Sequence, residues 1–192
     1  MTVIVENDAL LELCDNLCKS RFVAVDTEFM RENTFWSKLC LIQLASPNYS
    51  AVVDPLAEGI DLTPIDNLMD NQNILKIFHA GRQDLEIFFN RTGRLPAPLF
   101  DTQIAAMVCG FGDAASYESL ASTLAGTKID KSLRFTDWSK RPLSDKQIRY
   151  AHDDVVHMVT IYEKLEAHLN NSNRNSWINE EMSKLKSVSN YT

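Results

Sequence analysis

Two carboxylates follow a short apolar segment near the start of this 192-residue chain. Asp26 and Glu28 flank Thr27 directly after residues 21–25, a segment typical of a strand. Residues i and i+2 of a strand project to the same side, so both carboxylates would point together. Mg²⁺ is held by one or two carboxylates together with substrate phosphate oxygens. The pattern predicts a divalent metal site, with ordinary surface charge as the alternative.

Three further residues could belong to such a site. Asp84 lies in the first turn of an expected helix after the small-residue turn at 79–81, where stabilising the helix dipole is the alternative role. Tyr150 and Asp154 are four residues apart in another expected helix, so a phenol and a carboxylate would share one face. Asp153 would point about 100° away from Asp154. Each signal is weak by itself.

The elements that must position these residues follow from the hydrophobic spacing. Strands are expected at residues 21–25, 38–44, 50–53 and 74–78. Helices are expected from Asn7 or Asp8 to Leu17 and at 62–69, 84–90, 102–109, 117–124 and 144–169, with Asp101 as an N-cap. We therefore expect an α/β fold whose mixed central sheet, an antiparallel meander plus parallel strands, is flanked by helices.

Composition indicates one folded domain with a tail. At 45% hydrophobic residues the chain can bury one substantial core, and the polar stretch from Asn170 predicts a domain over residues 1–170 with a C-terminal tail or linker over 171–192. No basic start precedes an apolar run, and no stretch approaches the ~20 apolar residues of a membrane span, so we expect a cytoplasmic protein. The four cysteines are expected to be reduced core residues.

Charge is unevenly distributed along the chain. The formal net charge is −7, yet residues 128–149 hold seven basic and three acidic side chains. Contacts to phosphate groups come from Lys and Arg. The segment therefore predicts a phosphate-binding surface, with a solvated basic loop as the alternative.

The motifs together resemble the DEDD exonuclease superfamily, tyrosine subtype, and within it the ribonuclease D family. They are V-D-T-E-F at 25–29, L-I-Q-L at 41–44, H-A-G-x-x-D-L-E at 79–86, F-D-T-Q at 100–103, D-K-S at 130–132, T-D-W-S-K-R-P-L at 136–143 and Y-A-x-x-D at 150–154. The histidine subtype would carry His five residues before the last Asp, where this chain has Arg149. The resemblance covers residues 8–169, and the helical HRDC domains of longer family members are not expected in this chain.

The resemblance implies a ribonuclease H-like fold and a 3′→5′ exoribonuclease that releases 5′-monophosphates one at a time, in tRNA 3′ processing or RNA turnover. It implies two metal ions, Mg²⁺ or Mn²⁺, held by Asp26, Glu28, Asp84 and Asp154, while Tyr150 orients the attacking water. The implied partner is RNA with a free single-stranded 3′ end, with no membrane and no obligate protein partner. A proofreading-type DNA exonuclease and an inactive RNA-binding scaffold are the alternatives.

Candidate substrate contacts surround these motifs. They are Phe29, Gln43, His79, Gln83, Arg134, Lys140 and Arg141. The Phe ring is a candidate for stacking on a base, the two Gln and the His for reaching the terminal nucleotide, and the three cations for phosphate. Trp138 is expected to anchor the basic loop in the core.

Overall fold

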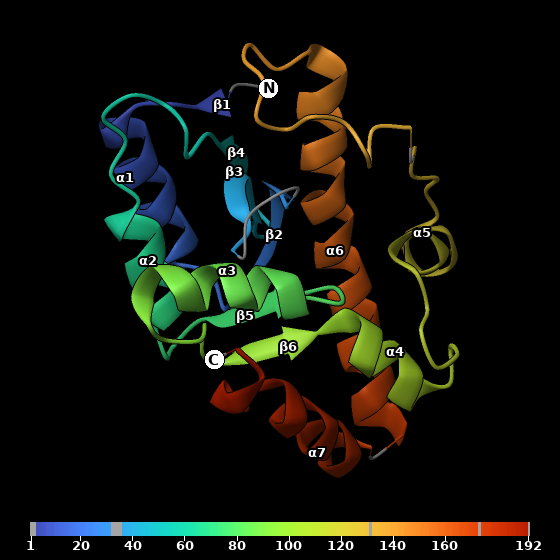
Figure 1. The fold of residues 1–192 in the computed structure, drawn as a ribbon. Coiled ribbons are helices and arrows are strands. Elements are labelled where there is room, and N and C mark those ends of the chain that lie inside the picture. Colours follow the sequence, from blue (N-terminus) through green and yellow to red (C-terminus); the bar gives the residue numbers. More distant parts are fainter. Residues whose placement is uncertain (1–2, 32–35, 131, 173, 192) are drawn as a thin grey trace.

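The computed structural model describes residues 3–31, 36–130, 132–172 and 174–191, and Lys131 of the basic segment lies outside them. Within these ranges the chain forms a mixed six-stranded sheet (Figure 1). The strands are β1 (Val3–Ile4), β2 (Phe22–Met30), β3 (Lys38–Ala45), β4 (Ser50–Val53), β5 (Leu75–Phe78) and β6 (Leu99–Asp101), in the spatial order β1-β4-β3-β2-β5-β6. The expected meander is β2-β3-β4, and the other strands join in parallel. The predicted fold class is confirmed, while β1 and β6 were not predicted.

Helices cover both faces of this sheet. They are α1 (Asn7–Leu17), α2 (Thr63–Asp70), α3 (Arg82–Thr92), α4 (Thr102–Cys109), α5 (Tyr117–Leu120), α6 (Asp145–Ser172) and α7 (Asn175–Leu185), with a π-helical turn at Ala121–Ala125 and a 3₁₀ turn at Val188–Asn190. One face packs on α1, α2 and α3, and the other packs on α6 (Figure 1). None of the described helices is long and apolar enough to cross a bilayer.

Two local predictions are wrong. Asn7 and Asp8 lie inside α1 rather than capping it, because the Asn7 side chain instead accepts a hydrogen bond from the Asp61 amide at 2.8 Å. Cys18 is exposed just after the helix ends, whereas Cys14, Cys40 and Cys109 are buried free thiols, as expected.

β2 extends beyond the predicted strand, and this extension creates space for a site. β5 pairs only with residues 22–24 of β2, because its last residue is Phe78 and the chain then turns away. β3 stays paired with β2 for the whole extension. Alternation along the strand places Asp26 and Glu28 on the face covered by α6, and Thr27 on the face covered by α3. The motif at 26–28 therefore lies within the strand and not after it.

One buried carboxylate holds the turn that follows β5. Asp101, 2% exposed, accepts hydrogen bonds from the amides of Ala80 (3.1 Å), Gly81 (2.8 Å), Gln103 (2.8 Å) and Ile104 (3.3 Å). It is thus the predicted N-cap of α4 and also the anchor of the turn before α3. Position 81 requires glycine, because a Cβ there would lie 2.5 Å from the Cβ of Phe78. This carboxylate fixes the start of α3, the helix that carries Asp84.

The segment after α6 packs against the rest of the domain instead of extending away as a linker. Ile178 and Met182 of α7, together with Tyr191, are buried in the main core. The Met182 sulfur also accepts a hydrogen bond from the Asp101 amide at 3.3 Å. The sequence also predicts a short helical stretch at residues 177–185, which is confirmed as α7. The division of the chain at residue 170 stays a prediction.

We predict that Asp101→Ala lowers the free energy of unfolding by about 3 kcal/mol, because buried amides lose a charged acceptor. Urea denaturation measures this loss, and Asp113→Ala, an exposed aspartate in a turn, is the matched control with no change expected. Equal stability of the two variants would show that Asp101 does not hold the turn.

Candidate active site

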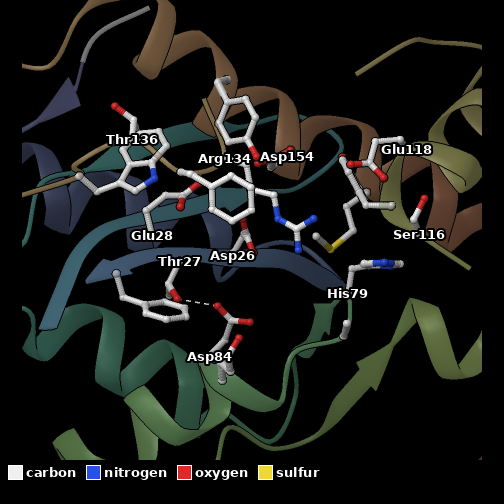
Figure 2. Close-up of a pocket in the computed structure, with 18 of the residues that line it drawn as sticks. Asp26, Thr27, Glu28, His79, Asp84, Ser116, Glu118, Arg134, Thr136 and Asp154 are labelled. Carbon is white, nitrogen blue, oxygen red and sulfur yellow. Dashed lines mark hydrogen bonds between the residues drawn. The ribbon is translucent and has the colours of Figure 1, made fainter. Parts of the chain in front are cut away.

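A cavity of about 650 Å³ lies where β2 extends past β5. Side chains from β2, α3, α5, α6 and the loop before α6 line it. Figure 2 shows carboxylates entering this space from several of these elements. Distant motifs of the sequence therefore meet around one cavity.

Three of the predicted metal ligands meet directly. Asp26 and Glu28 of β2 and Asp154 of α6 each place a carboxylate oxygen within 4.8 Å of the others (Figure 2). Burial and the neighbouring carboxylates raise the pKa of Asp26 well above its ordinary value. The same causes raise the pKa of Glu28 to about 9, and burial and nearby acids raise that of Asp154 to about 7. Such a cluster favours either protons or a cation between the carboxylates.

Asp84 lines the same cavity but stands beside this group. It is 6% exposed in the first turn of α3, and burial raises its pKa to about 7. The Thr27 hydroxyl donates a hydrogen bond to its carboxylate at 2.5 Å (Figure 2). Thr27 points away from the side chains of Asp26 and Glu28, so it holds the fourth carboxylate from the opposite face of β2.

Tyr150 reaches the cavity one helical turn before Asp154. Its ring centroid lies 5.9 Å from that of Trp138, which is 2% exposed and anchors the loop as predicted. Burial and the carboxylates raise the pKa of the Tyr150 phenol. A hydrogen bond from Tyr150 in turn acts to lower the pKa of Asp154. The phenol is therefore a hydrogen-bond donor at neutral pH.

Four of the predicted substrate contacts line the cavity, namely Phe29, His79, Gln83 and Arg134. Nδ1 of His79 forms a hydrogen bond with the Thr102 hydroxyl at 2.9 Å, and burial lowers the pKa of the imidazole. The ring is consequently neutral at pH 7, so it can hydrogen-bond without adding charge. The Arg134 charge acts to lower the pKa of Glu28 and Asp154 across the cavity.

The other three predicted contacts lie outside the lining of the cavity. Gln43 is fully buried in the sheet. Lys140 is an exposed surface residue 3.7 Å from Asp137. Arg141 donates to both carboxylate oxygens of Asp54, at 2.6 and 2.7 Å. Its guanidinium is engaged by Asp54 and stabilises the fold, and Arg141 is not among the residues that line the cavity.

Two residues of the cavity were not identified from the sequence but bear on its chemistry, Phe135 and Thr27. Phe135 lines it with 93% of its surface exposed, and the Arg134 guanidinium lies 5.6 Å from its ring centroid. An aromatic residue in a basic, polar loop was the available signal. Thr27 was passed over because its strand position opposes that of the carboxylates, and its link to Asp84 requires the tertiary structure.

Comparisons with known proteins identify the family of this chain. A family model described as 3′-5′ exonuclease matches residues 1–170. Ribonuclease D of Acidiphilium cryptum is 51% identical over 190 residues, which are 98% of this chain and 48% of that protein. The crystal structure of Escherichia coli RNase D, an exoribonuclease involved in structured RNA processing, has 35% identity and a TM-score of 0.93, covering 100% of this chain and 50% of that chain. The resemblance and the ribonuclease H-like fold are thereby confirmed.

One of the similar solved structures contains a metal ion. Brucella melitensis NrnC with bound Mg²⁺ is 28% identical with a TM-score of 0.76, covering 88% of this chain and 83% of that chain. The oxygen donors of Asp26, Glu28 and Asp154 are the type that a hard divalent cation prefers, and their spacing fits one ion. The chain spans about half the length of the curated relative, and by the family model it belongs to the 3′-5′ exonuclease family.

Proposed function

We propose that the chain is the catalytic domain of an exoribonuclease that removes nucleotides one at a time from RNA 3′ ends. The observation that carries this proposal is the convergence of Asp26, Glu28 and Asp154 within 4.8 Å in a cavity also lined by Asp84. Ribonuclease D relatives at about half identity support RNA as the substrate class. The physiological reaction we propose is tRNA 3′ processing or RNA turnover, on RNA with a free single-stranded 3′ end.

The four carboxylates would hold two divalent ions, Mg²⁺ or Mn²⁺. Bound ions supply Lewis acidity to the attacking and leaving oxygens of an in-line displacement. Asp26, Glu28 and Asp154 would be the metal ligands on one side of the site. Asp84, whose carboxylate accepts a hydrogen bond from Thr27, would be the ligand on the other side. Hydrolysis forms a bond between water oxygen and phosphorus and breaks the bond from phosphorus to the 3′ oxygen of the preceding nucleotide. The released product is a nucleoside 5′-monophosphate.

Tyr150 positions the attacking water in this proposal. Its pKa is raised, so the phenol keeps its proton and acts through a directed hydrogen bond rather than as a base. Arg134 faces the carboxylates across the cavity and provides positive charge for the phosphate. Phe29 and Phe135 offer ring faces to the terminal bases, which suits a sequence-tolerant reaction.

Two other functions make different predictions. A proofreading-type DNA exonuclease would use the same carboxylates but cleave DNA as well as RNA, since the 2′-hydroxyl is what separates the two substrates. An inactive scaffold would bind RNA without cleavage, yet each carboxylate that the chemistry needs is present.

We predict that Asp26→Asn lowers the cleavage rate at least about 1,000-fold, because a ligand that contributes several kcal/mol of transition-state stabilisation is lost. The assay is the one-nucleotide ladder formed from 5′-labelled RNA with Mg²⁺, with matched DNA and EDTA as comparisons. Asp113→Asn, an exposed aspartate, is the control. A fully active Asp26→Asn variant would refute the metal assignment.

We predict that the metal-free domain loses stability as the pH rises from about 4 to about 9, most steeply below about pH 7. The pKa values of Asp84 and Asp154, about 7, and of Glu28, about 9, lie above the value of about 4 in an unfolded chain. Between the unfolded and folded pKa values the folded state holds more protons, so its stability falls as the pH rises across this range and levels off above it. The melting temperature, measured with EDTA and with Mg²⁺, checks this. Mg²⁺ should offset the fall in melting temperature, and Glu28→Gln should make it smaller. If neither Mg²⁺ nor this substitution changes the fall, the carboxylate cluster is not its cause.

We predict that Phe135→Ala raises KM for single-stranded RNA about tenfold and leaves kcat within about twofold, because stacking on one base contributes about 1–3 kcal/mol. Phe135→Trp should keep the wild-type KM, since it retains a ring face. Steady-state kinetics on short RNAs measures both variants. An unchanged KM in Phe135→Ala would exclude a stacking role.

A further inference from the structure

We propose that Gln43 is a positioning residue for Asp26, an assignment that rests on the proposed metal-dependent function. Its side-chain amide would donate a hydrogen bond to the Asp26 side chain, and so would fix the orientation of the carboxylate. This replaces the predicted contact between Gln43 and the RNA, because the residue is 0% exposed and lies outside the lining of the cavity.

The register of the sheet places the two side chains together. Gln43 of β3 is the direct partner of Asp26 of β2 in the antiparallel ladder. Directly opposed residues project to the same face, with Cβ atoms about 4.5–5.5 Å apart. The neighbouring pair Ala24 and Ala45 lies on this same face, in the cluster that packs on α6. Gln43 therefore stands behind Asp26 on the side of the sheet that bears the carboxylates.

The side-chain amide of Gln43 is buried and unsatisfied within the described part of the chain. Neither Nε2 nor Oε1 has a hydrogen-bond partner among the described residues. Its neighbours on this face are apolar: Leu41 and Ala45 two residues away on β3, and Val52 opposite on β4. A buried amide without a partner costs free energy, so Gln43 calls for a role beyond packing. Asp26 is its cross-strand neighbour and can accept a hydrogen bond from it.

An ion bound to the cluster would require Asp26 as a carboxylate, which accepts hydrogen bonds and cannot donate them. A donor beside it, such as the Gln43 amide, would fix its orientation. Partners of this kind orient metal ligands, and their loss typically costs 10–100-fold in metal affinity or activity. Glutamine suits the position because it can donate without adding negative charge.

The test is Gln43→Met, which keeps the length of the side chain and removes both polar atoms. Isothermal titration of Mn²⁺ alone into the wild type, Gln43→Met and the control Leu41→Met measures metal affinity, and thermal melting in EDTA measures the metal-free fold. We expect Gln43→Met to bind Mn²⁺ about 10–100-fold more weakly. We expect its metal-free melting temperature to be equal to or above that of Leu41→Met, and its cleavage to recover at saturating Mn²⁺.

Three results would overturn the assignment. Unchanged Mn²⁺ affinity in Gln43→Met, with the wild type binding normally, would overturn the positioning role alone. Loss of the metal-free fold in both Gln43→Met and Gln43→Leu would show that the amide has a structural partner instead. A wild type that binds no Mn²⁺ would remove the proposed function and this assignment with it.

Discussion

Mutual repulsion among buried carboxylates is the constraint around which this molecule is organised. Asp26, Glu28 and Asp154 lie within 4.8 Å of one another, and Asp84 lines the same cavity. Their raised pKa values record the cost of gathering acids away from water. A flexible scaffold would let such groups separate. The surrounding fold must therefore hold each of them rigidly in place.

The scaffold does this with polar contacts at the two sides of the cavity. On one side, Asp101 binds the turn before α3 and so places Asp84. On the other side, the Arg141 guanidinium joins Asp54 to the backbone oxygens of Cys40 and Trp138, each 2.8 Å away. This ties the loop before α6 to the sheet, and with it the helix that carries Tyr150 and Asp154. Arg141, one of the cations of the basic segment, thus stabilises the fold and is not available to bind phosphate.

The sequence predicted those features that depend on local periodicity. The shared direction of Asp26 and Glu28 follows from strand alternation, and that of Tyr150 and Asp154 from the helical repeat. Contacts between residues that are far apart in the sequence were not predictable from it. The Asp54 partner of Arg141 is 87 residues away, and the pairing of Gln43 with Asp26 appears only once the register of β3 is known. β6 was missed because three residues carry no recognisable period.

Anomalous diffraction at the manganese edge, from crystals of the domain soaked with Mn²⁺ and a short RNA, would locate the metal ions directly. The two-metal account predicts two peaks about 4 Å apart. One should lie among Asp26, Glu28 and Asp154, and the other should lie toward Asp84. Absence of any peak within bonding distance of Asp26, Glu28 and Asp154, with RNA bound in the cavity, would contradict it.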